Sequence, residues 1–421
     1  MRAIRRLFGS LLVVTGLAVQ TQGSVPAEAN SVVNETITGA AKANGQFGLG
    51  LFARLRQQEG NLFFSPYSLS TALAMTYAGA RGQTHDQMAK TLHWCDGGEQ
   101  STPWTPAYLA QSLGAMIKEQ NRRGSQGQYE WVVANALWGH KDFAFLADFL
   151  QTIETHYGGK LHPVDFAGDP EAGRVTINTW VDDQTHGKIL DLIPKGVLDR
   201  TTRLVLTNAI YFKGDWSRPF NKDRTVKAPF KLGGGKTVEG PMMGQTSLFA
   251  YADNTDLQIL ELPYKGDELS MVILLPRQAD GLARVEQDLT WDAVTGWWGQ
   301  LRGCEVAVTI PRFKVTSQFS LAETLRSMGM TDAFSGGADF SGMTGRRDLF
   351  ISAVVHKAFV AVDEKGTEAA AATGAVMSLT SIAAAQPVVF RADHPFLFLI
   401  RDKVSGSILF VGRVTTPTEG T

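Results

Sequence analysis

The side chains that could take part in chemistry are few in this chain and lie far apart in the sequence. His356 sits in an apolar run, where it could act as a general base, although a hydrogen-bonded core histidine is the commoner use of such a residue. Residues 233–237 read Gly-Gly-Gly-Lys-Thr and end like a phosphate-binding loop, but Phe230 stands where that motif has its first glycine. We interpret 233–237 as a turn between strands. Neither a Gly-x-Ser-x-Gly elbow nor a His-Glu-x-x-His helix occurs, which argues against an enzyme.

Residues 364–386 are of a different kind, because they carry no large apolar side chain before Met377 and no proline. An alanine-rich segment favours a helix or a flexible loop by propensity. Laid out as a strand from Thr367, however, one face reads Thr-Ala-Ala-Thr-Ala-Met, and the other begins with Glu368. Such a segment could enter the middle of a sheet with its small face on a core. Gly366 lies where a hinge would need freedom of φ.

The rest of the chain reads as elements that would position this segment between buried strands. Helical patterns dominate the first 200 residues and strand patterns the remainder, without an internal repeat or a domain-sized linker. This is an α+β chain forming a single unit. We predict strands over 129–138, 204–212, 306–315, 349–363, 394–400 and 407–412, a hairpin over 257–276, and helices from Ser65-Pro66 to about Gly79, over 170–187 and around 291–298.

Composition excludes several classes of protein. The chain has 421 residues, 44% of them hydrophobic and 10% aromatic, so it can bury a large core. Its net charge of −1 gives no electrostatic case for nucleic acid, and no polybasic run argues for a membrane surface. No cofactor or metal is expected. Cys95 and Cys304 are the only cysteines, and the sequence leaves open whether they pair.

The N-terminus has the pattern of a secretory signal. Arg2, Arg5 and Arg6 precede an apolar run from Leu7 to Val19, which is too short to span a bilayer comfortably. We therefore expect a signal peptide over 1–23, a flexible leader over 24–40 and a secreted protein, extracellular or periplasmic. An ordinary N-terminal helix is the alternative, and cleavage after Ala27 or Ala29 remains open.

Several separate motifs resemble the serpin family. Residues 364–373, Glu-Lys-Gly-Thr-Glu-Ala-Ala-Ala-Ala-Thr, resemble the hinge of the reactive-centre loop of inhibitory serpins, and 390–398 resemble the segment that follows this loop. Residues 61–70, 206–216 and 355–358 also match, and the resemblance extends from about residue 40 to Pro417. It implies a serpin domain over 41–421 with three β-sheets, about nine helices and an exposed loop over 364–386.

The resemblance also implies a function. A target serine protease would attack the loop, form a covalent acyl-enzyme and be trapped when the loop inserts into the central sheet. The chain would act as a monomeric inhibitor and not as an enzyme. Two alternatives stay open, namely a serpin that keeps the fold for binding or storage, and an unrelated secreted enzyme with an alanine-rich loop.

Site residues follow from the resemblance by position. The reactive bond falls at Thr380–Ser381, with Leu379–Thr380 as the alternative. Threonine would suit an elastase-like pocket and leucine a chymotrypsin-like one. The remaining predicted residues are the hinge (Glu364, Lys365, Gly366, Thr367, Glu368, Ala369, Ala370, Ala371, Ala372), a polar cluster where the sheet must part (Ser65, Ser68, Asn208, His356), and the point of loop entry (Trp216, Arg312, Glu364).

Overall fold

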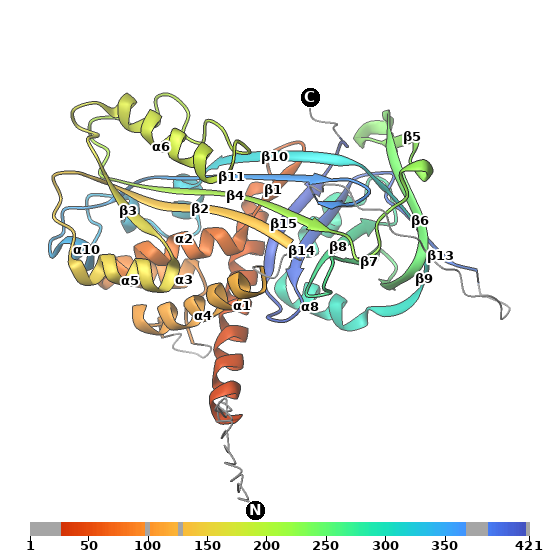
Figure 1. Cartoon of the computed structure of the whole chain (residues 1–421), viewed down its shortest axis with the longest axis horizontal. Helices are drawn as coiled ribbons and strands as arrows, with labels where there is room; N and C mark the ends of the chain where they lie inside the picture. The colour runs from red at the N-terminus through yellow and green to blue at the C-terminus, as the bar shows by residue number, and fades with distance from the viewer. Residues whose placement is uncertain (1–26, 97–101, 125–128, 368–385, 418–421) are drawn as a thin grey trace, which may run out of the picture.

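A six-stranded sheet lies across the molecule, with most helices packed beneath it and α6 on its other face (Figure 1). The computed structural model describes residues 27–96, 102–124, 129–367 and 386–417. The helices of these residues are α1 (Ala27–Leu55), α2 (Pro66–Gly79), α3 (Gly82–Thr91), α4 (Pro106–Gly124), α5 (Ala147–Tyr157), α6 (Pro170–Gln184), α7 (Leu282–Asp288), α8 (Trp291–Gln300), α9 (Ala322–Ser327) and α10 (Ser341–Thr344).

Strands of the described residues form two hydrogen-bonded sheets. The six-stranded sheet has the order β10-β11-β12-β4-β2-β3, and the nine-stranded sheet has the order β1-β15-β14-β8-β7-β6-β9-β13, with β5 beside β6. Their bounds are β1 (Leu62–Phe64), β2 (Tyr129–His140), β3 (Lys160–Val164), β4 (Leu204–Asp215), β5 (Val226–Lys231), β6 (Thr237–Asp253), β7 (Leu257–Pro263), β8 (Leu269–Pro276), β9 (Arg302–Pro311), β10 (Phe313–Ser320), β11 (Ile351–Val362), β12 (Gly366–Thr367), β13 (Val388–Arg391), β14 (Phe396–Asp402) and β15 (Ile408–Val414).

The α+β class is confirmed. The family resemblance implied three separate sheets, whereas the strands of the described residues form two hydrogen-bonded sheets. The cause is the length of β6, which has 17 residues. It pairs with β5 over Thr237–Met242, with β9 over Met242–Tyr251 and with β7 over Ala250–Asp253. It therefore joins strands that would otherwise form two sheets.

The centre of the six-stranded sheet is a parallel pair, β4 and β11. After a register shift between Ile351 and Ala353, the two strands are in register from Ala353 opposite Val205 to Phe359 opposite Tyr211. Beyond this point β12 lies between them and is antiparallel to both. The central pair therefore separates at one end, and the chain that follows β11 occupies the opening.

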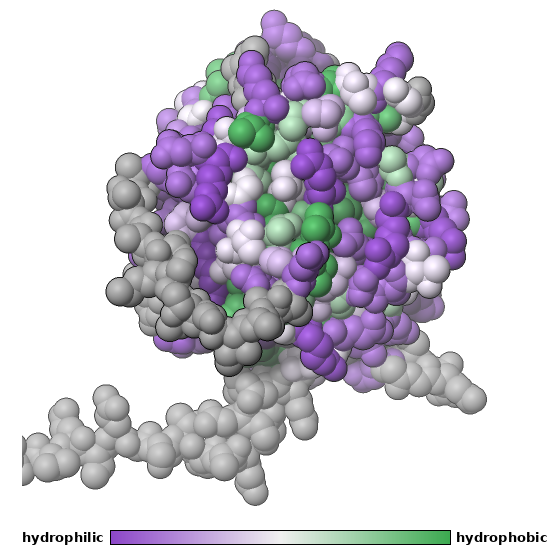
Figure 2. Space-filling view, turned by 90° about the vertical axis from the view of Figure 1, so that its right-hand side faces the viewer, coloured by the Kyte–Doolittle hydropathy of each residue, from purple (hydrophilic) through white to green (hydrophobic). Residues whose placement is uncertain are grey.

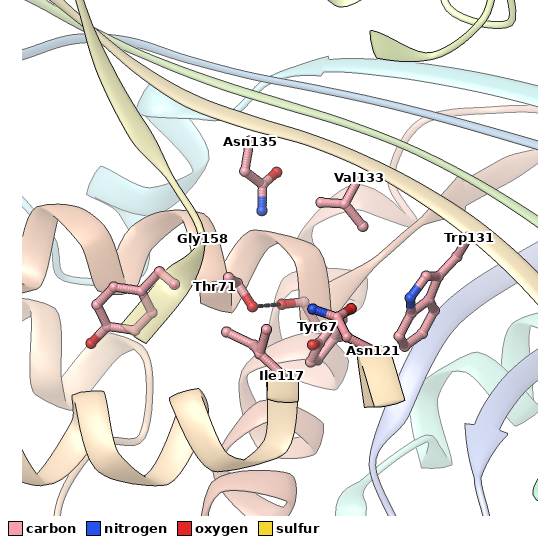
Figure 3. Close-up of a pocket in the computed structure, with 9 residues that line it drawn as sticks. Tyr67, Thr71, Ile117, Asn121, Trp131, Val133, Asn135 and Gly158 are labelled. Carbon is pink, nitrogen blue, oxygen red and sulfur yellow. Dashed lines mark hydrogen bonds between the residues drawn. The ribbon is translucent and has the colours of Figure 1, made fainter. Parts of the chain in front are cut away.

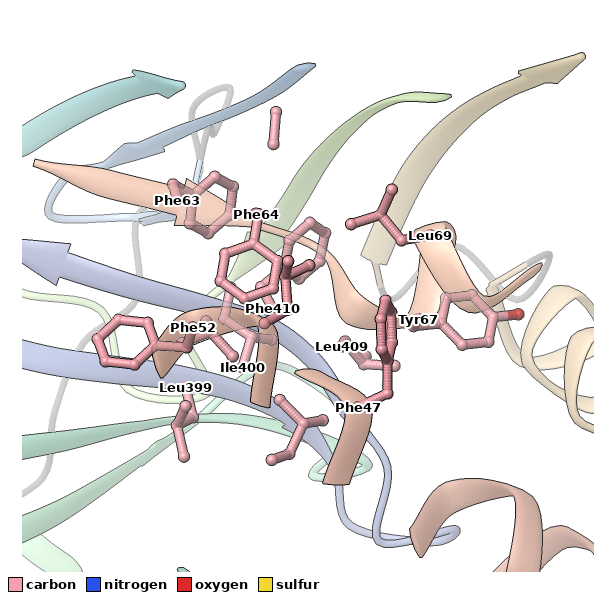
Figure 4. Close-up of a cluster of buried hydrophobic side chains, with 14 of the residues drawn as sticks. Phe47, Phe52, Phe63, Phe64, Tyr67, Leu69, Leu399, Ile400, Leu409 and Phe410 are labelled. Carbon is pink, nitrogen blue, oxygen red and sulfur yellow. The ribbon is translucent and has the colours of Figure 1, made fainter. Parts of the chain in front are cut away.

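The larger of two hydrophobic cores includes α2 and side chains of both sheets, and the smaller lies between the six-stranded sheet and α6. Ser65 caps α2 by accepting a hydrogen bond from the backbone N–H of Ser68, and Pro66 supplies the first turn. All residues of α2 except Ala78 are buried, since the helix lies under one sheet and beside the other. Phe63 of β1 stacks on Phe410 of β15 with ring centroids 5.0 Å apart, next to side chains of α1 (Figure 4).

One expectation for the N-terminal region needs correction. A flexible leader was predicted over 24–40, but α1 is helical from Ala27 onward. Small polar composition was a poor guide, because alanine and glutamate are also good helix formers. Residues 1–23, the expected signal peptide, lie outside the described residues. Among the described helices, none is long and apolar enough to cross a membrane.

Two smaller differences concern the second half of the chain and the cysteines. The strand predicted over 306–315 is two strands, β9 and β10, which are separated by Arg312. Cys95 and Cys304 are free thiols, so the question left open by the sequence is answered against a disulfide.

Candidate functional site

The hinge begins with a tight turn at the end of β11, and its next two residues already lie inside the sheet. The turn is closed by a hydrogen bond from the backbone N–H of Asp363 to the carbonyl of Gly366. Thr367 then pairs with Gly214 of β4 on one side and with Val362 of β11 on the other. The first residues of the predicted insertion segment thus adopt the conformation of a central strand. Glu368, Ala369, Ala370, Ala371, Ala372, Leu379, Thr380 and Ser381 lie outside the described residues.

Gly366 is required for a different reason from the one expected. Its backbone is not among the glycines with positive φ, so freedom of φ is not what the turn uses. A Cβ atom at this position would lie 2.0 Å from the carbonyl oxygen of Gly214 and 2.7 Å from the Cα atom of Asp215. Only glycine permits β12 to approach β4 this closely.

Aromatic rings line the point at which β12 enters the sheet. Trp216 stacks on Tyr264 with ring centroids 4.7 Å apart, and its Nε1 donates to the carbonyl of Asp363 at 3.0 Å. The hydroxyls of Tyr264 and Thr367 form a hydrogen bond of 2.9 Å, and burial raises the pKa of Tyr264. Trp216 therefore lies beside β12, and its role as the point of loop entry stays a prediction. Tyr264 was not predicted, because its role arises only when the residue after β7 forms an isolated β-bridge with Trp216.

Glu364 is a buried carboxylate with two donors. Its side chain is 1% exposed, and its Oε1 accepts from Arg312 Nη2 at 2.5 Å and from Thr225 Oγ1 at 2.6 Å. Burial opposes ionisation, but the hydrogen bonds from Thr225 and Arg312 outweigh it and hold the pKa of Glu364 below its usual value. The predicted contact between Arg312 and Glu364 is present. Thr225 was missed, since it lies in an irregular stretch before β5.

The predicted polar cluster forms beneath the central pair of strands. His356 of β11 is fully buried, and burial lowers its pKa to about 3, so the ring is neutral. Its Nδ1–H donates to Asn208 Oδ1, and its Nε2 accepts from the backbone N–H of Ser65 at 3.2 Å. Both ring nitrogens are used within the protein. This is the structural role for His356 that the sequence favoured over a catalytic base.

The cluster continues through Asn208 to the helix below and to the next strand. Asn208 Nδ2 donates to Ser68 Oγ at 2.7 Å and to Asn135 Oδ1. Ser68 Oγ also donates to Asn135 Oδ1, at 3.3 Å. These contacts connect α2, β2, β4 and β11. Asn135 was missed, although the alternation predicted for 129–138 placed it on a strand.

A cavity of about 280 Å³ lies beside this cluster, under β2 and above α4 (Figure 3). Asn135, Val133 and Trp131 extend into it from β2, and its floor includes Ile117. Its lining contains no charged side chain; the lining residues are Tyr67, Thr71, Ile117, Asn121, Trp131, Val133, Asn135, Tyr157 and Gly158. Within the described parts of the chain, no group of His, Cys, Asp and Glu could hold a metal ion.

Comparison with protein families gives one match over nearly the whole folded chain. The family model described as "Serpin (serine protease inhibitor)" matches residues 42–417.

Similar curated proteins are named as inhibitors. The leukocyte elastase inhibitor of Bos taurus is 45% identical over 385 residues, which is 89% of this chain and 98% of that protein. The human protein of the same name is 44% identical over 90% of this chain and 99% of that protein. Human Serpin B3 is 42% identical, also over 90% of this chain and 99% of that protein.

Solved structures share the fold. Human thyroxine-binding globulin superposes with a TM-score of 0.82 at 30% identity, over 91% of this chain and all of that one. Uncleaved ovalbumin has a TM-score of 0.79 at 30% identity, over 90% of this chain and all of that one. Serpin48 of the insect Tenebrio molitor has a TM-score of 0.77 at 30% identity, over 92% and 99%.

Proposed function

Starting from the fact that this chain belongs to the serpin family and is a protease inhibitor rather than an enzyme, we propose that it acts as a suicide substrate. The observation that supports this most is the position of Gly366 and Thr367. They lie between β4 and β11 and are antiparallel to both. A longer insertion would extend the same pairing in the same direction. The small side chains that follow on the face of Thr367 would then meet the core.

The chemistry begins at the reactive bond. The protease's serine hydroxyl adds to the carbonyl carbon of Thr380, the C–N bond to Ser381 breaks, and the amine of Ser381 leaves with a proton. Thr380 is then held to the protease as an ester. Water would normally hydrolyse this ester, so inhibition requires that insertion outrun hydrolysis.

Insertion supplies the displacement and the driving force. Residues 367–380 number 14, and at about 3.3 Å each they make a strand of about 45 Å. The inserted strand replaces the parallel pairing of β4 with β11 by two antiparallel ladders, so backbone hydrogen bonds are gained. The protease, still esterified to Thr380, is carried to the far end of the sheet. Its oxyanion hole is distorted there, and deacylation stalls.

The polar cluster joins β4 to β11, the two strands between which the loop would insert. Separation of β4 from β11 begins beyond the pair Phe359–Tyr211, and the pair His356–Asn208 lies three register positions further on. Insertion past that point breaks the His356–Asn208 hydrogen bond, which is buried. We assign to this cluster the role of keeping the sheet closed until the loop is cut.

The loop's composition favours an elastase-like target. Threonine at 380 is small and β-branched, which suits a shallow pocket, and similar proteins are named leukocyte elastase inhibitor. If Leu379–Thr380 is the bond instead, a deeper, chymotrypsin-like pocket fits better. Between Gly366 and Arg391 there is no Lys or Arg, so a trypsin-like target is disfavoured under both registers.

We also propose that the protein is secreted as a monomer after removal of residues 1–23. The support is the arginine-rich start followed by the apolar run from Leu7 to Val19. Mass spectrometry of the protein recovered outside the producing cells tests this, with a mature N-terminus at Ser24, or a few residues later, as the expected result. Recovery of the intact chain only from the cell interior would overturn it.

Two measurements test the inhibitory function. Incubation with elastase-, chymotrypsin- and trypsin-like serine proteases should give a complex that survives denaturing electrophoresis with one of the first two. A loop that is cut without any complex would instead indicate a serpin that does not inhibit.

Mass spectrometry of the released C-terminal fragment then locates the reactive bond. We expect the fragment to begin at Ser381, and a fragment beginning at Thr380 moves the bond to Leu379–Thr380. A start before Met377 would leave too short a strand for full translocation and would overturn the trapping mechanism.

A further inference from the structure

Three aromatic side chains form a triangular cluster between α6 and the six-stranded sheet. His162 of β3 stacks on Trp138 of β2 with ring centroids 4.6 Å apart. Trp180 of α6 contacts both rings, with centroid distances of 5.4 Å to Trp138 and 5.5 Å to His162. The cluster therefore joins two strands of the sheet to the helix that covers them. We call these three residues the α6 aromatic cluster.

The α6 aromatic cluster is also connected to the central strands of the sheet. Trp138 Nε1 donates a hydrogen bond to Thr207 Oγ1 of β4 at 2.9 Å. The smaller hydrophobic core, to which Trp138 belongs, includes Val205 of β4 and Ala353 of β11, which lie opposite each other in the parallel pair. Ile177 of α6 packs in the same core. α6 therefore covers the junction of β4 and β11, the two strands between which the loop would insert.

A strand inserted at this junction must disturb the packing of α6. Neighbouring strands of a sheet lie about 4.8 Å apart, so one added strand widens the surface beneath α6 by that distance. In the resting protein Thr367 is opposite Gly214 of β4. If the antiparallel pairing continues, residue 376 comes to lie opposite Val205, which is under α6. The inserting segment therefore reaches the region covered by α6 before all of its 14 predicted residues are in place.

His162 is the member of the cluster whose charge can change near neutral pH. Its ring is partly buried, and its Nε2 is buried without a hydrogen-bond partner among the described residues. Burial lowers the pKa of His162, and the positive charge of Lys160 on the same strand adds to this effect. A protonated ring would be attracted to the indole faces, but its charged N–H would lack an acceptor. Because the pKa is lowered, the second effect outweighs the first.

The elements packed against His162 offer its ring no carboxylate partner in the described part of the chain. Lys160 is the charged group that acts on the pKa of His162. His140, on the same face of β2 as Trp138, bonds through its Nε2 to Asp142. The charged and titratable side chains of these elements that could face the ring are Lys160 on β3, Glu130 and His140 on β2, Asp148, Glu154 and His156 on α5, and Glu171, Arg174, Asp182 and Asp183 on α6.

We propose that the α6 aromatic cluster makes loop insertion pH-dependent, with His162 as the positioning residue that takes up the proton. This inference rests on the proposed insertion mechanism and adds a regulation to it. With a neutral ring, α6 is held over β4 and β11, and insertion has to displace it. Once α6 is displaced, the ring regains an ordinary affinity for protons, with a pKa near 6.5. The displaced state therefore binds more protons, so docking of α6 weakens and insertion becomes faster as the pH falls below about 6.5.

The cluster lies away from the side of the molecule at which the chain leaves the loop. α6 is at the left of Figure 1, whereas β13, which follows the loop in the sequence, is at the right. Figure 2 shows that right-hand side, where hydrophilic side chains surround a smaller number of hydrophobic ones. A substitution in the α6 aromatic cluster can therefore change insertion while this side of the molecule stays as it is.

The test measures insertion without a protease. A synthetic peptide copying residues 367–380 can occupy the place between β4 and β11, and its incorporation is followed by the rise in the melting temperature of the protein. We expect the rate of incorporation by wild type to rise by up to about tenfold from pH 7.5 to pH 5.5. His162→Phe keeps an aromatic ring in the stack but takes up no proton, so the ratio of the two rates should be at least about threefold smaller than in wild type.

Two further variants complete the experiment. His162→Gln also lacks a titrating ring and should give the same loss, which guards against an effect of the apolar phenylalanine. His156→Phe changes an exposed histidine of α5 and should keep the wild-type ratio.

Each contrary outcome has a separate meaning. A wild-type ratio in both His162 variants removes the role of His162 and leaves insertion intact. If wild type incorporates no peptide at either pH, the sheet does not open and the inference fails. If the ratio depends on His162 but no protease forms a stable complex with wild type, the pH control of the sheet stands and the proposed inhibitory function fails.

Discussion

At the scale of single residues, Glu364 is a negative charge held almost wholly out of water where the hinge leaves β11. Its partner Arg312 is 38% exposed, so the pair lies at the boundary between the protein and the solvent. The pair also ties the hinge to the loop between β9 and β10. Its loss would affect the opening of the sheet as well as the stability of the fold.

Replacement of this carboxylate should loosen the top of the sheet. Glu364→Lys puts a like charge beside Arg312 and removes the acceptor of Thr225. Breaking a buried pair from one side costs about 3 kcal/mol or more. We expect the variant to form loop-into-sheet polymers on mild warming, as measured by native electrophoresis and size-exclusion chromatography.

A suitable control breaks a similar pair on the surface. Glu323 contacts Arg326 Nη1 at 2.8 Å and is mostly exposed, and an exposed pair contributes at most about 1 kcal/mol. Glu323→Lys should therefore stay monomeric under the same warming. If Glu364→Lys also stays monomeric and fully inhibitory, the role assigned to the pair is wrong.

His356 gives the protein a pH dependence of known sign. The unfolded residue takes up a proton near pH 6.5, but burial lowers the pKa of the folded residue to about 3. Between these values the unfolded state binds one more proton, so stability falls as the pH is lowered. One proton corresponds to about 1.4 kcal/mol per pH unit.

A titration of stability isolates this contribution. We expect the unfolding free energy, measured by denaturant between pH 6.5 and 5, to fall less steeply in His356→Gln than in wild type. Because the glutamine substitution lowers stability at every pH, the readout is the slope of the unfolding free energy against pH and not its value at one pH. His156→Gln changes an exposed histidine and serves as the control. Equal slopes for wild type and His356→Gln would show that the buried ring does not govern this range.

At the scale of elements, β12 determines what a hinge substitution can do. Thr367 is already buried and bonded to Tyr264 before any protease acts. Thr367→Arg therefore has two effects, because it displaces β12 from the resting sheet and prevents later insertion at the same position. Burial of an unpaired charge costs several kcal/mol.

We expect Thr367→Arg to be a substrate instead of an inhibitor. The loop should be cut at the normal bond and the protease released active, which a stoichiometry assay with electrophoresis measures. Glu368→Arg is the matched control, since alternation along a strand puts residue 368 on the opposite face. Complex formation by Thr367→Arg at the wild-type stoichiometry would contradict loop insertion itself.

At the scale of the whole molecule, the features that could be predicted from the sequence were those that depend on residues adjacent in the chain. Ser65-Pro66 begins α2 because a cap and a first-turn proline are adjacent in the chain. The hairpin over 257–276 was predicted at its observed bounds, and Gly266 and Asp267 in its turn have positive φ. The motif around 364–373 predicted the family for the same reason, and the family model confirms this. The hinge role of these residues stays a prediction.

What could not be predicted depends on contacts between distant segments. Asn135 joins the site because β2 pairs with β4, and Tyr264 joins it because the residue after β7 forms a β-bridge with Trp216. No spacing in the chain marks either residue. The reason expected for Gly366 was wrong, since the atom that excludes a side chain there belongs to Gly214, which is 152 positions away.

The pairing of β1 with β15 has a consequence for how the protein is made. Phe64 is opposite Val411, so a strand near the start of the folded chain completes its sheet only when nearly the last residues have been synthesised. At 5–20 residues per second, the ribosome needs roughly 17 to 70 seconds to cover that interval. The hinge and loop emerge before β14 and β15 do. The loop ends at residue 386, and the 25 residues from there to Val411 take roughly 1 to 5 seconds at the same rate. Only for this short interval does a newborn chain hold its complete hinge and loop without the pairing of β1 with β15.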